Sequence, residues 1–201
     1  MRVTEYEQRS PEWYAARLGV PTASNFGKFI TPTGKPSAQA RGYIHQLVAE
    51  RITGTSKIIP VNEAMQHGID LEPEARQYYE LCYDVKVFEL GLCLHDSLDV
   101  GASPDGLVGE NGLIEIKCPY EDHVQIEYLD NKKLPDRYKA QVMGQLWITE
   151  REWCDFFAYH KTISPFLIRV YRDEEYISQL AECVTEAIDV IQLLTDKYSR
   201  K

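Results

Sequence analysis

The clearest pattern in the chain is the alternation of apolar and polar residues in LIEIK, residues 113–117. Because successive side chains of a strand point to opposite faces, Ile114 and Ile116 share one face. The other face carries Leu113, Glu115 and Lys117. Side chains two residues apart on one face are separated by roughly 6.6–7 Å, so Glu115 and Lys117 can both reach one small pocket.

Further strands are predicted where short apolar runs are bounded by turn-forming residues. They cover residues 85–95, 98–108, 152–160 and 165–173. The dipeptide Asn111-Gly112 stands between apolar runs and predicts a hairpin turn. This hairpin would bring Asp105, near the end of one strand, next to Glu115 on the other.

Helices are predicted where apolar residues recur every three or four positions. Ser10 is suited to cap the first of them, and Pro73 either starts or kinks a later one. In the segment 137–149, the helical repeat places Tyr138, Gln141 and Gln145 on one face. The predicted helices cover residues 10–19, 21–30, 37–54, 61–83 and 137–149, and a closing helix begins at about residue 174.

The order of these elements predicts the fold class. Helices come first, a group of strands with a helical crossover follows, and a long helix closes the chain. Such an order is typical of an α/β fold in which a central mixed β-sheet is flanked by helices. The length of 201 residues suits one core, so a single domain is expected over 1–201.

The composition argues against some classes of protein and leaves others open. The five cysteines are scattered and never form CxxC, which argues against a disulfide framework or a structural zinc site. No apolar run approaches the ~18 residues that span a bilayer, so no membrane association is expected. The net charge of -9 argues against a nucleic-acid binder. Locally grouped basic residues, or metal ions at a carboxylate cluster, can offset that charge.

Asp105, Glu115 and Lys117 form the candidate active site. Two carboxylates brought together favour a shared cation, and Mg²⁺ is the natural one for oxygen ligands. A lysine beside them can orient or deprotonate a water and stabilise developing charge, which suits metal-assisted hydrolysis of a phosphodiester. The alternative is a solvated strand face, but unpaired charge in an otherwise apolar, central strand is costly. A third carboxylate for a second metal ion is expected from Glu72, with Glu74 as its rival.

These residues stand in segments that resemble a known family. SPDGL (103–107) and LIEIKCP (113–119) are similar to the P-D…E-x-K nuclease signature, and specifically to the phage lambda exonuclease, or YqaJ-type viral recombinase, family. The resemblance continues, in the same order along the chain, in the segments EWYAARLGVPTAS (12–24), GIDLE (68–72), AQVMGQLWIT (140–149) and RDEEY (172–176). Five ordered blocks are far more specific than a lone E-x-K.

The resemblance implies a restriction-endonuclease-like core and a 5′→3′ exonuclease of linear duplex DNA that leaves 3′ single-stranded overhangs for phage-type recombination. It implies two Mg²⁺ ions per site, which Mn²⁺ can replace, with Lys117 as the catalytic lysine. The implied metal ligands are Asp105, Glu115, the Ile116 carbonyl and Glu72. The residues implied to hold the terminal 5′-phosphate are Arg17, Ser24, Ser103 and Gln141.

The resemblance also implies partners and a setting. The expected assembly is a homotrimeric ring, a single-strand annealing protein is a possible partner, and the expected location is the cytoplasm of a bacterial host of a phage or prophage. Two alternatives stay open. One is another P-D…E-x-K nuclease, either an endonuclease or a single-strand-specific enzyme. The other is a catalytically silent module that binds DNA ends.

Overall fold

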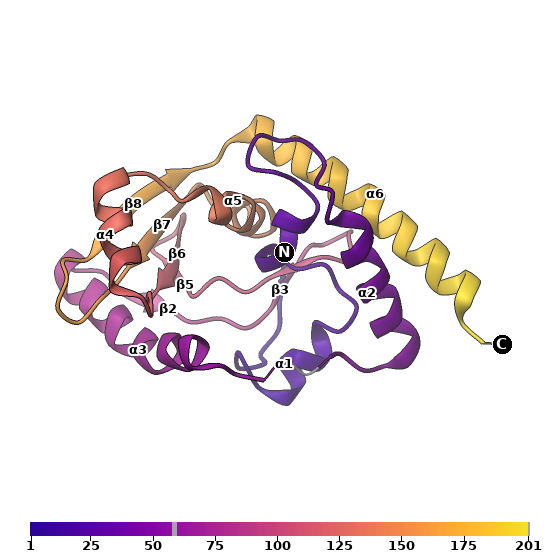
Figure 1. Cartoon of the computed structure of the whole chain (residues 1–201), viewed down its shortest axis with the longest axis horizontal. Coiled ribbons are helices and arrows are strands. Elements are labelled where there is room, and N and C mark those ends of the chain that lie inside the picture. The colour runs from indigo at the N-terminus through magenta and orange to yellow at the C-terminus, as the bar shows by residue number, and fades with distance from the viewer. Residues whose placement is uncertain (58–59, 201) are drawn as a thin grey trace.

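The computed structural model describes residues 1–57 and 60–200, and it contains the predicted central mixed sheet (Figure 1). Across the sheet, the strands are β2 (Val87–Phe88), β5 (Gly106–Val108), β6 (Gly112–Lys117), β7 (Trp153–Ala158) and β8 (Phe166–Tyr171). β6 and β7 run parallel, whereas the other neighbours are antiparallel. The LIEIK segment therefore forms a central strand, as predicted.

A second sheet was not expected from the sequence. It is antiparallel and consists of β1 (Arg2–Val3), β3 (Cys93–Leu94) and β4 (Gly101–Ala102). The predictions of single strands over 85–95 and 98–108 are therefore wrong, because each segment divides between the two sheets. At Gly91 the N-terminal segment crosses so closely that a Cβ would lie 2.5 Å from the carbonyl oxygens of Thr4 and Tyr6.

The predicted hairpin is present, but its turn was misplaced. Val108 pairs with Gly112, so the turn occupies residues 109–111, and Gly109 has the positive φ of +55°. Gly112 instead opens β6. A Cβ at Gly112 would lie 2.1 Å from the Trp153 ring, so close packing rather than turn geometry requires glycine there.

The helices follow the predicted periodicity with one exception. The chain forms α1 (Pro11–Ala16), a 3₁₀ helix η1 (Ala23–Lys28), α2 (Ala40–Thr53), α3 (Glu63–Tyr83), α4 (Asp122–Asn131), α5 (Asp136–Thr149) and α6 (Glu174–Tyr198). Ser10 caps α1 as expected, and α3 continues through Pro73. α4 was missed because its buried side chains, Gln125 and Tyr128, give no apolar stripe. Among the described residues, no helix combines the length and apolar character needed to cross a membrane.

The two faces of β6 contact different helices (Figure 1). Ile114 and Ile116 pack in one cluster with Leu71, Ala75 and Tyr79 of α3. On the other face, Leu113 belongs to the larger core built around α5, α6, α2 and η1. The alternation in the sequence therefore assigned the faces correctly, and it places Glu115 on the side of α5.

Candidate active site

The site is built on an edge of β6 that β5 leaves uncovered. Strand pairing ends at Gly106 and Ile114. Beyond this point the Asp105 carboxylate replaces a strand partner, because its Oδ2 accepts a hydrogen bond of 2.7 Å from the Ile116 N–H. The N–H and C=O of one strand residue face the same neighbour, so the Ile116 carbonyl lies on this edge too.

Glu115 lies beneath α5 with only 1% of its surface exposed. Its Oε1 accepts a hydrogen bond from Gln141 Nε2, and its Oε2 accepts one from Gln145 Nε2, both at 2.6 Å. Oε1 also forms an ion pair with Lys117 Nζ, which lies 5.3 Å from the centre of the Tyr138 ring. The predicted face of Tyr138, Gln141 and Gln145 is confirmed, and it faces the Glu115–Lys117 pair.

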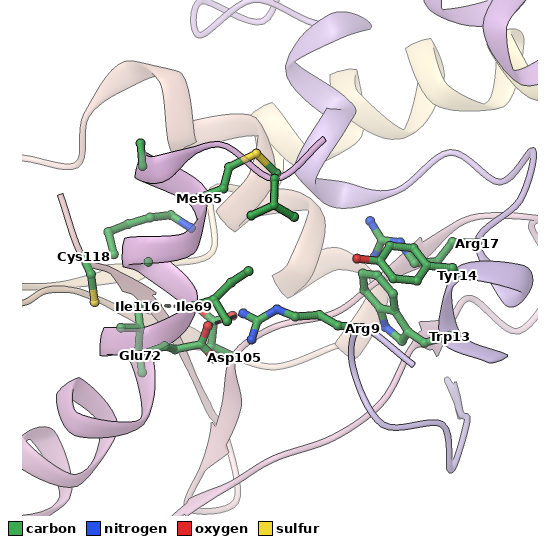
Figure 2. A pocket seen from close by; sticks show the side chains of 14 residues that line it. Arg9, Trp13, Tyr14, Arg17, Met65, Ile69, Glu72, Asp105, Ile116 and Cys118 are labelled. Carbon is green, nitrogen blue, oxygen red and sulfur yellow. Dashed lines mark hydrogen bonds and ion pairs between the residues drawn. The ribbon is translucent and has the colours of Figure 1, made fainter. Parts of the chain in front are cut away.

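Glu72 reaches the site from α3, on the opposite side of the sheet. It lines the same cavity of about 570 Å³ as Asp105 and Lys117 (Figure 2). The rival carboxylate, Glu74, is directed elsewhere, since its Oε1 accepts a hydrogen bond of 2.8 Å from the Tyr159 hydroxyl. The structure therefore brings Glu72 rather than Glu74 to this cavity, although Pro73 follows it directly.

Asp105 and Lys117 both have shifted pKa values. Burial raises the pKa of Asp105 well above its usual range, and the nearby charge of Glu115 raises it further. Burial acts to lower the pKa of Lys117, but the Glu115 and Asp105 carboxylates outweigh it and raise that pKa above its ordinary value. Lys117 is therefore held as a cation, which suits charge stabilisation better than proton abstraction.

The donor atoms on this edge fit a hard divalent cation. The carboxylates of Asp105, Glu115 and Glu72 and the carbonyl of Ile116 are all oxygen ligands, which Mg²⁺ prefers. Asp105 and Glu115 are also like charges in partly desolvated positions, and a shared cation relieves their repulsion. The chemistry of the donor set thus matches the metal expected from the sequence.

The carboxylates are nevertheless engaged by cationic side chains. Glu115 is paired with Lys117, and Glu72 contacts Arg9 at 2.5 Å and Arg76 at 3.0 Å. Within residues 1–57 and 60–200, no three His, Cys, Asp or Glu side chains already form a metal-binding arrangement. Binding of a cation would therefore require these ion pairs to open.

A second polar group surrounds Arg17, the C-terminal cap of α1. Its guanidinium donates hydrogen bonds to the hydroxyl oxygens of Ser103 (3.2 Å), Thr22 (3.2 Å) and Ser24 (3.3 Å). It also lies 4.0 Å from the centre of the Trp13 ring, and Trp13 Nε1 donates to Ser103 Oγ at 3.0 Å. Arg17 and Trp13 line the same cavity as Asp105 and Lys117 (Figure 2).

The electrostatics of Arg17 are those of an anion site. Burial lowers the pKa of Arg17 to about 10. In the described part of the chain, its hydrogen-bond acceptors are neutral hydroxyls, and no carboxylate forms an ion pair with it. A desolvated guanidinium without a counter-ion is costly, and an anion that accepts its hydrogen bonds would remove that cost.

A match to a known protein family shows which family this chain belongs to. A family described as the YqaJ-like viral recombinase domain matches residues 12–152. The chain belongs to this family. The matched region contains the Arg17 group, Glu72, the Asp105–Lys117 edge and α5, so the family assignment covers both polar groups of the cavity.

Solved structures agree with this assignment. The YqaJ-like chain is 37% identical to an alkaline exonuclease, LHK-Exo, from Laribacter hongkongensis, with a TM-score of 0.81 over 94% of this chain and 97% of that one. A complex of LHK-Exo with dAMP matches with a TM-score of 0.80. A phage-related exonuclease from Haemophilus somnus is 16% identical, with a TM-score of 0.71 over 90% of this chain and 96% of that one, and shares the fold. These matches confirm the restriction-endonuclease-like α/β fold.

A curated relative is much longer. The chain is 27% identical over 170 residues to the uncharacterized protein R354 of Acanthamoeba polyphaga mimivirus. The match covers 77% of this chain but only 29% of that protein.

Sequence reasoning named five of the residues that line this YqaJ-like cavity, Arg17, Glu72, Asp105, Ile116 and Lys117, and it missed several contacts made there. Arg17, Ser24 and Ser103 come together as expected, whereas the amide of Gln141 bonds to Glu115 rather than to that group. The missed residues include Trp13 and Thr22 beside Arg17, Gln145 as a partner of Glu115, and Arg9 and Arg76 on Glu72. The helical repeat that linked Gln141 to Gln145 pointed to the contact of Gln145, whereas nothing local in the sequence signals the pairing of Arg9 with a residue 63 positions away.

Proposed function

We propose that this YqaJ-like protein is a metal-dependent nuclease that degrades linear duplex DNA from its ends in the 5′→3′ direction. It leaves 3′ single-stranded overhangs for recombination, in the cytoplasm of a bacterium that carries the phage or prophage. The nuclease class is supported by the family and by the similarity to a protein called an alkaline exonuclease. The polarity, the duplex substrate and the metal are our proposal.

One observation carries the choice of an end-directed enzyme. The cavity of about 570 Å³ has the uncompensated Arg17 on one side and the Asp105–Lys117 edge on the other. A terminal phosphate carries more negative charge than an internal phosphodiester, so a partly buried guanidinium with hydroxyl neighbours favours the terminal one. An anchored 5′-phosphate would bring the next phosphodiester to a fixed distance from the carboxylates.

The roles of the residues follow from their chemistry. Asp105, Glu115 and the Ile116 carbonyl would hold one Mg²⁺, and Glu72 with Asp105 would hold a second. A divalent cation held there would supply Lewis acidity toward a phosphoryl oxygen and would lower the pKa of a water molecule. Lys117, held protonated by its acidic neighbours, stabilises the negative charge that develops on the phosphate.

The four residues expected to hold the terminal phosphate do not form one hydrogen-bonded group. Arg17, Ser24 and Ser103 supply a cation and two hydroxyls, and each hydroxyl accepts a hydrogen bond from Arg17. Gln141 contacts Glu115. We therefore propose that Gln141 reaches a bound phosphate from the carboxylate side of the cavity, so that it joins the two polar groups.

A single assay separates this function from its alternatives. The wild-type protein is incubated with supercoiled circular DNA and with end-labelled linear duplex, each in Mg²⁺ and in Ca²⁺. Loss of one strand from the ends of the linear duplex, with intact circles, is the expected result. Nicked or linearised circles would identify an endonuclease, digestion restricted to single strands would identify that alternative, and binding without digestion would identify a silent end-binding module.

Assembly and partnership rest on the family resemblance alone. We propose a homotrimeric ring, because DNA threaded through a closed ring cannot diffuse away between steps even when a protein with a net charge of -9 binds it weakly. A single-strand annealing protein would then receive the 3′ overhang. Mn²⁺ should replace Mg²⁺, since both take oxygen ligands.

A further inference from the structure

Arg9 is the cationic residue at the cavity that neither the fold nor the proposed chemistry explains. It stands just before Ser10, the cap of α1, and its φ of +70° lies in the left-handed region that residues with a side chain rarely adopt. The preceding residue is fixed, because Gln8 Nε2 donates hydrogen bonds to the carbonyls of Leu90 (3.1 Å) and Pro104 (2.9 Å). The backbone is thus anchored beside the Asp105 loop in a conformation that directs Arg9 into the cavity.

The side chain of Arg9 uses this position to contact Glu72. Its Nη2 lies 2.5 Å from Glu72 Oε2, and Figure 2 shows it between the Trp13–Arg17 group and the Glu72–Asp105 pair. The Glu72 side chain is only 16% exposed, whereas that of Arg9 is 42% exposed. The guanidinium can therefore leave Glu72 for solvent or for a ligand in the cavity without losing a buried position.

Arg76, the other arginine that contacts Glu72, is more buried than Arg9 and has a second counter-ion. Arg76 lies one turn later on α3, its side chain is 14% exposed, and its Nη1 is also paired with Glu89 at 2.5 Å. Arg76 therefore stays with its helix and has a second counter-ion. Arg9 is the partner that Glu72 can release.

The charges around the cavity give a reason for the release. Asp105, Glu115 and Glu72 are opposed by three cations, Lys117, Arg9 and Arg76. A divalent cation that uses Glu72 must displace Arg9 from the same oxygen, because two cations cannot share it without strong repulsion. The displaced guanidinium would remain beside the path between Arg17 and Asp105, where the proposed substrate carries its phosphates.

We infer that Arg9 is a positioning residue that serves as a replaceable counter-ion for Glu72. It holds Glu72 in place until a divalent cation takes over that carboxylate, and it then pairs with a phosphate of the bound strand. The inference rests on the proposed function, because it requires a metal at Glu72 and a nucleic-acid substrate. It adds a specific competition between an arginine of this chain and the second metal ion.

The test measures metal affinity without DNA and without turnover. Mn²⁺ is titrated by calorimetry into the wild-type protein, Arg9→Gly and Arg41→Ala. Glycine removes the guanidinium and accepts the left-handed backbone, so misfolding does not follow from the change itself, and a matching circular dichroism spectrum verifies the fold. Arg41 is an exposed arginine of α2 and is the matched control for the loss of one positive charge.

We expect the Mn²⁺ site that uses Glu72, the weaker of the two proposed sites, to bind Mn²⁺ more tightly in Arg9→Gly. Its Kd should fall roughly two- to fivefold, the range for an ion pair with an exposed partner, whereas Arg41→Ala should match the wild type. In Ca²⁺, Arg9→Gly should also bind 5′-phosphorylated duplex more weakly, and its salt dependence should correspond to about one fewer phosphate contact.

Three results would overturn the inference. Unchanged or weaker Mn²⁺ binding by Arg9→Gly would refute the competition, and unchanged DNA affinity and salt dependence would refute the phosphate contact. Both leave the proposed function intact if Asp105→Asn still abolishes metal binding. A wild-type protein that binds no Mn²⁺ would refute the proposed function and this inference together.

Discussion

Replacement of Arg17 by methionine tests the pocket for the terminal phosphate most directly. Methionine keeps much of the aliphatic volume that packs on Trp13, and it removes the charge together with the hydrogen bonds to Ser103, Thr22 and Ser24. A companion change to lysine keeps the charge, but it loses the planar group that stacks on the ring and can grip a phosphate with two N–H groups.

The magnitude follows from the contacts. A hydrogen bond to a charged group contributes about 1.5–3 kcal/mol, which corresponds to roughly a 10- to 150-fold change in kcat/KM. That loss should apply to duplex with a 5′-phosphate and leave duplex with a 5′-hydroxyl nearly unchanged. The preference for the phosphorylated end should therefore fall roughly 10- to 150-fold in Arg17→Met, and by less in Arg17→Lys.

The pKa of Arg17 adds an independent readout. Because burial lowers this pKa to about 10, the folded protein carries an energetic cost for the charge at every pH below about 10, and the cost is relieved as the pH rises through that value. At neutral pH an anion in the pocket should relieve the same cost. Inorganic phosphate should therefore raise the Tm of the wild type but not that of Arg17→Met.

The assay compares kcat/KM on end-labelled duplexes that differ only at the 5′ end, with Arg41→Ala as the control for loss of a surface charge. An unchanged ratio of the two substrates in Arg17→Met would place the phosphate pocket elsewhere. An equal loss on both substrates would show that Arg17 supports the fold or the chemistry rather than recognition of the end.

The remaining predictions address the catalytic edge, the packing and the assembly. Lys117→Ala should lower turnover by about 100-fold or more, as for a lost transition-state donor, while calorimetric Mn²⁺ binding persists; activity within tenfold of the wild type would contradict its role. Asp105→Asn should retain an acceptor for the Ile116 N–H but abolish Mn²⁺ binding, so undiminished binding would exclude it as a ligand. Gly144→Ala should lower the free energy of unfolding by about 1–3 kcal/mol, because a Cβ would lie 2.3 Å from the Phe26 ring. In urea titrations the matched change Gly42→Ala, which meets open space in α2, should instead stabilise by up to about 1 kcal/mol. Light scattering should give a mass near three times 23.2 kDa, and a monomeric mass would refute the proposed trimeric ring.

The sequence predicted those parts of the fold whose signals are local. Alternation in LIEIK assigned both faces of β6 correctly, because a central strand must bury apolar residues on each side it packs. The helical repeat in 137–149 placed Gln141 and Gln145 on the face that contacts Glu115. Glu72 was expected as a third carboxylate with Glu74 as its rival, and the resemblance of GIDLE (68–72) to the family favoured Glu72, since a glutamate before a proline alone looks like a helix boundary.

The features that the sequence did not predict depend on contacts between distant segments. The split of 85–95 between two sheets follows from the N-terminal segment that crosses at Gly91, more than 80 residues away in the chain. The ion pair between Arg9 and Glu72 has the same origin. Such contacts leave no periodic trace, because each requires only one residue of suitable shape or charge at each end.

The sequence Ser103-Pro104-Asp105-Gly106 explains why the candidate metal site lies where it does. If the pairing of Gly106 with Ile114 continued by two residues, Pro104 would stand opposite Ile116. Proline has no N–H, so it cannot donate to the Ile116 carbonyl, and a regular ladder must end there. Asp105 then satisfies the Ile116 N–H with its side chain. The same break therefore ends β5, leaves a backbone carbonyl on the open edge of β6 and adds a carboxylate beside it, which together are two of the oxygen donors that a divalent cation requires.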